Sequence, residues 1–157
     1  MLSADEQLTL ALIRALKENE IAASRFYAAC AAAYHAHQLH WQFLQMQEEE
    51  HTLVLEKIEK DFTERPHRWL RGKILPDTVH FLISELKKNT ALVATRDMNE
   101  AHAINFSIDF ESSLVEKELL ASLSTSDPDF EHLLVKLRSE TADHRHRLLV
   151  LQRDVRA

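Results

Sequence analysis

Glu48 and His51 are the pair of residues whose types and spacing most directly indicate chemistry in this sequence. Every third or fourth residue around them belongs to an otherwise apolar series, which is typical of a buried helix face: Trp41, Leu44, Glu48, His51, Leu55, Ile58 and Phe62. A carboxylate and an imidazole on that face are unfavourable unless they are hydrogen-bonded, ion-paired or bound to a metal ion. Because Glu-x-x-His on a bundle helix places two metal ligands side by side, the segment predicts a buried metal site.

Three other apolar series also contain polar residues. Glu20 interrupts the first, with Tyr27 two turns further on; Glu111 interrupts the second; and His144 lies in the third, three residues after Thr141. The series are Ile13, Leu16, Glu20, Ala23, Tyr27, Cys30 and Tyr34; Ile104, Ser107, Glu111, Leu114, Glu118 and Ala121; and Phe130, Leu134, Leu137, Thr141, His144, Leu148 and Leu151. We therefore expect carboxylates and imidazoles from separate helices to meet in one core.

Four long helices must position these side chains. Ser3 followed by Glu6 has the spacing of a capping box and predicts the start of the first helix. Asp127 before Pro128 predicts an N-cap and a first helical position for the last one. The helices are expected at about 4–36, about 39–63, about 99–124 and from 128 onward. A short polar stretch between the first two predicts that they pack antiparallel.

The connection 64–98 between the second and third helices has a different character. Pro66, Gly72 and Pro76 interrupt it, and Asp77 or Thr78 is expected to cap a short helix. The apolar residues of that short helix are Val79, Phe81, Leu82, Ile83 and Leu86. Four basic residues surround Trp69, and we expect them to be solvated rather than to bind an anionic partner: Arg65, Arg68, Arg71 and Lys73.

The two helical hairpins repeat one another. Glu20 corresponds to Glu111, His51 to His144, Glu48 to Thr141 and Tyr27 to Glu118. Glu20 and His51 are 31 residues apart and Glu111 and His144 are 33 apart, a difference that the turn between helices can absorb. Ligand-type residues therefore recur in both halves, with a threonine in place of one carboxylate.

Three segments resemble the helix motifs of the ferritin-like superfamily and, within it, of the rubrerythrin-like branch: 20–27 (EIAASRFY), 48–51 (EEEH) and 103–111 (AINFSIDFE). The resemblance spans nearly the whole chain. It implies an all-α, ferritin-like four-helix bundle with a long crossover, containing a short helix, between helices 2 and 3. It also implies a carboxylate-bridged di-iron centre, in which two helices each supply a Glu and two each supply Glu-x-x-His. The positions that match ligands are Glu20, Glu48, His51, Glu111 and His144.

Several positions depart from the family pattern. Thr141 stands where the family has its fourth carboxylate, and a neutral hydroxyl neither bridges nor neutralises two irons comparably. Glu140 lies about 40° from His144 around the helix, so we expect its longer side chain to be able to enter the site as a replacement ligand. Leu114 occupies a place where rubrerythrins often carry another Glu, and Glu118 replaces a tyrosine. Tyr27 is the candidate catalytic side chain, with a satisfied core aromatic as the alternative.

Composition narrows the class of protein. A length of 157 residues suits a single domain, 1–157, and one Gly and three Pro favour long helices over a sheet. A formal net charge of −6 argues against nonspecific binding to nucleic acid. Cys30, the single cysteine, excludes an intramolecular disulfide and fits a cytoplasmic protein as a small buried hydrophobe. Neither a signal sequence nor a membrane span is predicted. His35, His37 and His40 are expected in a solvated turn rather than on a surface metal.

Two functional hypotheses follow. The first is a di-iron protein that uses two Fe ions to reduce peroxide or dioxygen, or to oxidise Fe(II), with Glu48 as the bridging ligand. Because no rubredoxin-like tail follows, its electrons are expected from a separate donor protein, and the family's habit suggests a homodimer. The alternative is a degenerate bundle without redox activity, which serves as a scaffold or binding module or holds a single Zn or Mn ion.

Overall fold

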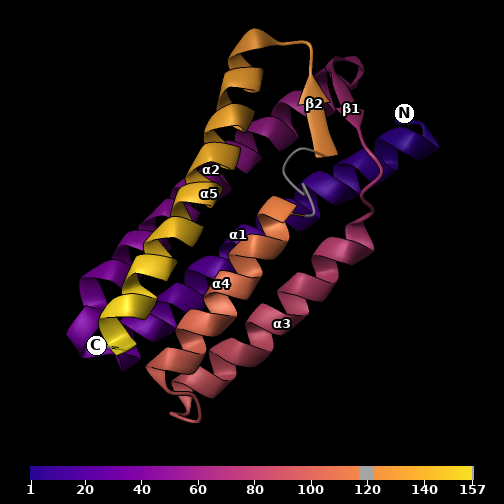
Figure 1. Ribbon diagram of the computed structural model, residues 1–157. Coiled ribbons are helices and arrows are strands. Elements are labelled where there is room, and N and C mark those ends of the chain that lie inside the picture. The colour runs from indigo at the N-terminus through magenta and orange to yellow at the C-terminus, as the bar shows by residue number, and fades with distance from the viewer. Residues whose placement is uncertain (117–121, 157) are drawn as a thin grey trace.

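The computed structural model describes residues 1–116 and 122–156, and within them the protein is mostly helical, as predicted (Figure 1). Two of its helices, α1 and α2, are joined by the single 3₁₀ turn His35–His37, and α3 and α4 follow before the last helix, α5. Two three-residue strands lie side by side near one end of the molecule (Figure 1). The elements are α1 (Ala4–Ala33), α2 (Gln38–Glu64), β1 (Trp69–Arg71), α3 (Pro76–Ala94), α4 (Glu100–Glu116), β2 (Leu123–Thr125) and α5 (Pro128–Arg156).

The predicted starts of the first and last helices, α1 and α5, are confirmed. The Ser3 hydroxyl accepts a hydrogen bond from the Glu6 backbone N–H, and the Glu6 carboxylate accepts one from the Ser3 backbone, which completes the capping box of α1. At α5, Oδ1 of Asp127 accepts hydrogen bonds from the backbone N–H groups of Asp129 and Phe130. These caps satisfy backbone donors that the first turn of a helix leaves unpaired.

The predicted apolar faces form the core. All seven residues of the series on α2 are at most 2% exposed, and the series on α1 is buried up to Cys30. On α5 the series is buried from Leu134 to Leu151. The described part of the α4 series, from Ile104 to Leu114, is buried as well, whereas Glu118 and Ala121 lie outside the described residues. The 3.6-residue period therefore identified the inward side of each helix.

The helix in the crossover is longer than predicted. α3 has 19 residues, begins at Pro76 and runs along α1 (Figure 1). Asp77 and Thr78 lie inside its first turn rather than at its cap, and no side chain caps it. Phe81, predicted as a core residue, is 61% exposed. The helix extends to Ala94 because Val93 is buried in the core together with the predicted Val79, Leu82, Ile83 and Leu86.

Two short strands were not predicted. β1 pairs antiparallel with β2, with Leu70 opposite Ser124, and so joins the crossover to the segment before α5. The prediction that the third helix reaches Ser124 is wrong, since β2 occupies that position. The backbone N–H of Gly72 donates to the Ser122 carbonyl over 2.6 Å, and that of Ser126 donates to the Arg68 carbonyl, which extends the pairing at both ends.

The basic residues of the crossover are paired within the chain more than predicted. Arg65 contacts the buried carboxylate of Asp61, which also accepts a hydrogen bond from the indole N–H of Trp69 over 2.8 Å. Arg68 contacts Asp127 at 2.9 Å. Arg71 reaches Asp5 in the first turn of α1, whereas Lys73 is exposed as expected. These contacts fix the crossover to three separate elements.

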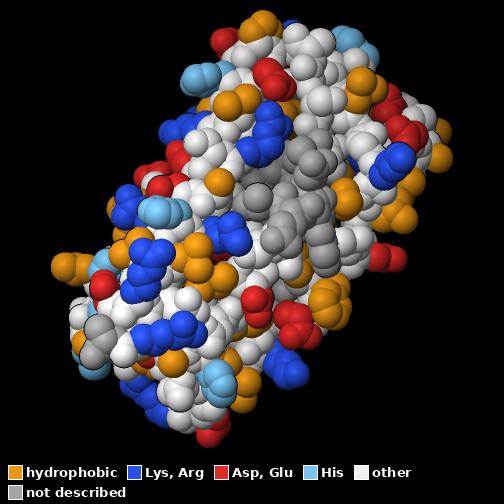
Figure 2. Space-filling model, viewed as in Figure 1, with side chains coloured by type: hydrophobic (Ala, Val, Ile, Leu, Met, Phe, Trp, Pro, Cys, Tyr) orange, Lys and Arg blue, Asp and Glu red, His pale blue; other side chains and the backbone are white. Residues whose placement is uncertain are grey.

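The surface carries charges of both signs. Figure 2 shows Lys, Arg, Asp, Glu and His side chains interspersed with hydrophobic ones across one face of the molecule. In the part of the chain that the structure describes, no helix combines the length and the apolar character that crossing a bilayer requires.

Candidate metal centre

Six polar or ionisable side chains lie together in the middle of four helices. They are Glu20 of α1, Glu48 and His51 of α2, Glu111 of α4, and Thr141 and His144 of α5, and each is at most 2% exposed. The helix periodicity brings them there, because each occupies a position of the inward-facing series on its helix. Burial of so many ionisable groups is unfavourable unless they have partners.

Five of these side chains form two groups that share Glu48. One donor atom each of Glu20, Glu48 and His51 lies within 4.8 Å of the others, and the same holds for Glu48, Glu111 and His144. Nδ1 of His51 lies 3.6 Å from Oε2 of Glu48, and Nδ1 of His144 lies 2.8 Å from its Oε1. The two imidazole rings stack with their centroids 5.4 Å apart. Glu48 therefore lies between the two histidines.

Polar atoms at this centre lack hydrogen-bond partners. Among the described residues, these atoms include Oε2 of Glu20, Glu48 and Glu111 and Nδ1 of His51 and His144. Nδ1 of His144 is close to Glu48 but out of line for a hydrogen bond. One unpaired buried polar group costs about 1–3 kcal/mol, so these five atoms are candidates for binding a cation. A metal cation is the partner that accepts lone pairs from carboxylates and imidazoles together.

The outer nitrogen of each imidazole is held by a residue of the opposite helix. Nε2 of His51 lies 2.8 Å from Oε2 of Glu140, and Nε2 of His144 lies 2.6 Å from Oε1 of Gln47. A carboxylate and an amide oxygen both accept hydrogen bonds, so each Nε2 carries the proton when the ring is neutral. The lone pair of each ring is then on Nδ1, toward the other ligands, as in histidines that bind metals.

Glu140 therefore lies elsewhere than the sequence predicted. It does not belong to either ligand group but contacts the outer nitrogen of His51, and its other oxygen lies 3.6 Å from Nζ of Lys136. Its carboxylate, 20% exposed, borders a cavity of about 20 Å³ that also touches His51. Its side chain extends toward His51 of α2 rather than into either ligand group.

Thr141 contributes no charge to the centre. Its hydroxyl donates a hydrogen bond to the Leu137 carbonyl one turn earlier in α5, over 2.8 Å. Leu114, at the position where an additional Glu was considered, is buried and apolar. Glu118 lies outside the described residues. The described ligand set is thus three carboxylates and two imidazoles, with one carboxylate fewer than the repeat of the hairpins leads one to expect.

Tyr27 connects the centre to the surrounding core. It is fully buried, and its hydroxyl donates a hydrogen bond to Oε1 of Glu111 over 2.6 Å. Burial, with the nearby carboxylates of Glu111 and Glu48, raises the pKa of the phenol well above its usual value. Cys30, one turn away, is buried, and its burial also raises the pKa of the thiol.

The pKa values at the centre are strongly displaced. Burial and the charge of Glu48 raise the pKa of Glu20, and burial followed by Glu48 raises that of Glu111. Burial also opposes ionisation of Glu48, but the nearby Glu20, His144 and His51 side chains outweigh it and hold its pKa well below the ordinary value. Burial disfavours the charged form of His144, yet Glu111 and Glu48 raise its pKa to about 10. Without a cation, protons balance these carboxylates.

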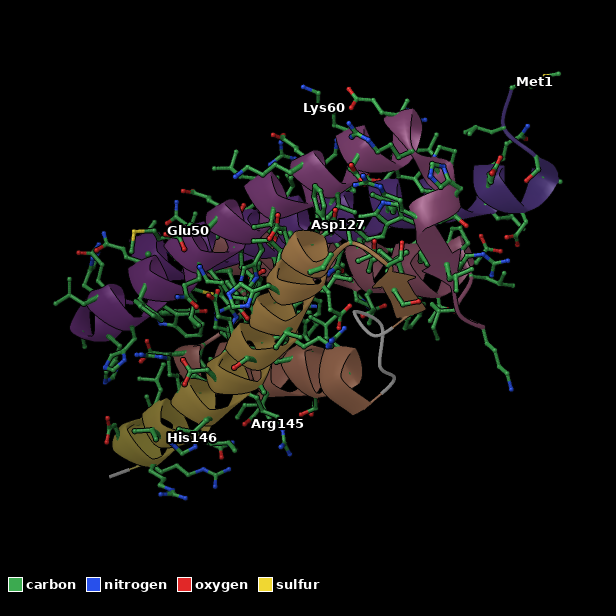
Figure 3. All side chains as sticks on the ribbon, turned by 90° about the horizontal axis from the view of Figure 1, so that it is seen from above. Met1, Glu50, Lys60, Asp127, Arg145 and His146 are labelled. Atoms are coloured by element: carbon green, nitrogen blue, oxygen red, sulfur yellow. The ribbon has the colours of Figure 1, made fainter. Side chains whose placement is uncertain are left out.

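Ligand-type residues off the inward faces do not join the centre. Asp143 and His146, which share the three-residue spacing, are exposed as expected, and Figure 3 shows His146 on the outer side of α5 and Glu50 on the outer side of α2. His35 and His40 are exposed as well, whereas Nδ1 of His37 lies 2.6 Å from the Glu100 carboxylate.

Gln47 was missed in the sequence, although a signal was present. It precedes Glu48 as Glu140 precedes Thr141, so the internal repeat that aligned the ligands also aligns the two residues that hold the outer nitrogens. Periodicity alone did not select Gln47, because it lies at the edge of the apolar face and is half-buried.

Comparison of the chain with models of known protein families, with characterised proteins and with solved structures gives no match.

Proposed function

We propose that this protein is a ferritin-like, rubrerythrin-type bundle of α1, α2, α4 and α5 that holds a carboxylate-bridged pair of iron ions and reduces peroxide or dioxygen, or oxidises Fe(II). The pair of three-residue groups that share Glu48 supports two ions with one bridging ligand. The single observation that carries the proposal is the set of five buried ligand atoms without hydrogen-bond partners.

In this proposal each hairpin supplies one set of terminal ligands. Glu20 and His51 would hold one ion and Glu111 and His144 the other, with Glu48 available to both. Such a metal pair, when bound, supplies two adjacent redox-active Lewis acids that can engage one O–O bond. Mixed carboxylate and imidazole donors suit Fe(II) and Mn(II) better than thiolate-preferring ions.

The other residues of the centre hold protons and orient ligands. Glu140 and Gln47 fix the tautomers of His51 and His144, so that both Nδ1 lone pairs are available. The hydroxyl of Tyr27 donates a hydrogen bond to Glu111 and so orients that carboxylate. Apolar core residues around the centre exclude bulk water, which strengthens each electrostatic contact inside.

A second candidate function is a bundle without redox chemistry, either metal-free or with one Zn or Mn ion. Two observations favour it: Thr141 brings no fourth carboxylate, and the displaced pKa values describe a centre whose charges protons can balance. Under this alternative, shared protons would have to satisfy the five atoms that have no hydrogen-bond partner.

Metal analysis separates the two functions. Protein purified without chelator and loaded anaerobically with Fe(II) is expected to hold two irons per chain, and Glu48→Gln is expected to lose both because the two groups share that carboxylate. Glu49→Gln, an exposed neighbour on the same helix, is the matched control and should keep both ions. A wild-type protein that binds no iron, and whose melting temperature ignores added Fe(II), would reject the di-iron proposal.

A further inference from the structure

Three oxidisable aromatic rings lie in a row between the centre and the surface. The hydroxyl of Tyr27 contacts Glu111, and the Tyr27 and Trp41 ring centroids are 6.0 Å apart. The centroids of Trp41 and Tyr34 are 6.1 Å apart. Tyr27 and Trp41 are fully buried, whereas Tyr34 is half-buried at the C-terminal end of α1. The row therefore begins at a ligand of the centre and ends at the turn between α1 and α2.

The polar group of each ring has an oxygen acceptor. The indole N–H of Trp41 donates to Oε2 of Glu100 over 3.0 Å, and the hydroxyl of Tyr34 donates to the Met98 carbonyl over 2.7 Å. A carboxylate beside the indole stabilises the positive charge that the ring acquires when it loses an electron. Tyr27 has Glu111 to take up its phenolic proton, since a phenol loses its proton on oxidation.

We propose that Tyr27, Trp41 and Tyr34 form an electron-transfer pathway between the buried carboxylate and imidazole centre and the surface at the turn between α1 and α2. What the pathway serves rests on the proposed function: it carries single electrons inward from a one-electron reductant in solution. The reductant delivers them at Tyr34, the ring of the three that reaches solvent.

The electrons and protons balance at every ring. Tyr27 gives up one electron toward the centre, and its phenolic proton moves to Oε1 of Glu111. Trp41 returns an electron to Tyr27, which recovers its proton, and Trp41 becomes a radical cation beside Glu100. Tyr34 reduces Trp41 and releases its proton to water, and the external reductant, with a proton from water, restores Tyr34. Two such passages supply the two electrons that, with two protons, convert one hydrogen peroxide to two waters.

Two phenylalanines extend the aromatic cluster on the far side of Tyr27. The ring centroids of Phe26 and Tyr27 are 5.7 Å apart, and those of Phe26 and Phe106 are 5.1 Å apart. Both tyrosines of the chain and one of its two tryptophans belong to the row. The repeat position that corresponds to Trp41 in the second hairpin is Leu134, so the row exists on one side of the centre.

Photo-oxidation of the metal-free protein tests the pathway directly. A flash-generated ruthenium(III) polypyridyl oxidant removes electrons at the surface, and freeze-quench electron paramagnetic resonance distinguishes the Tyr27 radical from that of Tyr34 by their side-chain torsions. Assignment uses Tyr27→Phe. In the wild type we expect the signal to appear at Tyr34 and then at buried Tyr27. Trp41→Phe should abolish the Tyr27 signal and keep that of Tyr34, and Trp69→Phe, the other buried tryptophan, should keep both.

A second variant and the absence of metal make the outcomes of this test distinguishable. Tyr34→Phe should also abolish the Tyr27 signal, which guards against a folding defect in Trp41→Phe, and circular dichroism checks both variants. A wild-type protein without a Tyr27 radical, or a Tyr27 signal that survives in both Trp41→Phe and Tyr34→Phe, overturns the pathway. Because this test needs no metal, its failure is distinguishable from failure to bind iron, which overturns the proposed function alone.

Discussion

The two helical hairpins build the same constellation, but only one is complete. The hairpin of α1 and α2 supplies Glu20, Glu48 and His51, whereas the hairpin of α4 and α5 supplies Glu111 and His144 and has Thr141 at the position of Glu48. Thr141 turns its hydroxyl to its own backbone. Glu48 therefore belongs to both groups, and two of the three carboxylates come from the α1–α2 hairpin.

The two halves also differ in the residues that contact the outer nitrogens of the histidines. The outer nitrogen of His51 faces a carboxylate, Glu140, whereas that of His144 faces the neutral amide of Gln47. An imidazole that donates its outer N–H to a carboxylate is a stronger metal ligand than one that donates it to an amide. Glu140 thus comes from the half that has Thr141 at the position of Glu48, and its carboxylate lies behind the histidine of the other half.

Restoring the missing carboxylate is expected to have the largest effect on metal binding. In Thr141→Glu we expect iron affinity to rise by at least about tenfold, equivalent to about 1.4 kcal/mol, because both halves then supply a bridging candidate. The metal-free variant should be destabilised by about 3 kcal/mol, since another carboxylate is buried among Glu48 and Glu111. Calorimetric titration and thermal unfolding with and without Fe(II) measure both effects. Thr141→Val is the control, with metal binding unchanged; equal affinity in Thr141→Glu would contradict the account.

A smaller effect is expected in the pH dependence of the stability of the metal-free protein. The folded-state pKa of His144 is raised to about 10, so its contribution to the stability of the metal-free protein is complete below the unfolded value of about 6.5 and is lost as pH rises through about 10. Stability should therefore fall between about pH 6.5 and about pH 8.5, by up to about 1.4 kcal/mol per pH unit for one proton. Bound metal displaces that proton and removes the slope.

Urea unfolding at several pH values checks this slope. His144→Gln should flatten it, and His146→Gln, an exposed neighbour, should leave it unchanged. His51, whose pKa is also raised, faces Glu48 and Glu140 and is a second contributor. A metal-free protein whose stability rises over this interval would mean that the carboxylates do not hold His144 charged.

The smallest expected effect comes from the residues behind the histidines. Glu140→Gln should weaken metal binding about tenfold, because His51 loses a charged acceptor but keeps a hydrogen bond. Gln47→Glu should strengthen metal binding, because His144 gains a charged acceptor. The double variant with Glu140→Gln and Gln47→Glu should bind metal about as tightly as the wild type. Competition titrations with a chelating dye measure these differences. Equal and negligible effects in both single variants would show that the outer contacts do not tune the ligands.

Helix periodicity predicted which residues of the centre face inward, because every third or fourth residue of a helix lies on the same side. Glu20, Glu48, His51, Glu111 and His144 were predicted to face inward, and each is buried where its series is buried. Periodicity did not predict the direction of the Glu140 side chain. From its position on α5 the carboxylate could extend toward the centre or toward α2, and it contacts His51 on α2.

The elements that were missed depend on contacts between distant segments. β1 and β2 have three residues each, too few for an alternating pattern, and they form only because the crossover meets the segment before α5. The length of α3 likewise depends on its packing along α1, which buries Val93 beyond the apolar run that predicted the helix. Local propensity is a weak guide where tertiary contacts decide.

Anomalous diffraction from crystals loaded with Fe(II) would locate bound ions relative to these five side chains. We expect two iron peaks, one bound by Glu20 and His51 and the other by Glu111 and His144, with Glu48 between them and both imidazoles coordinating through Nδ1. Peaks confined to the protein surface, with the three carboxylates and two histidines bonded only to each other, would contradict this expectation.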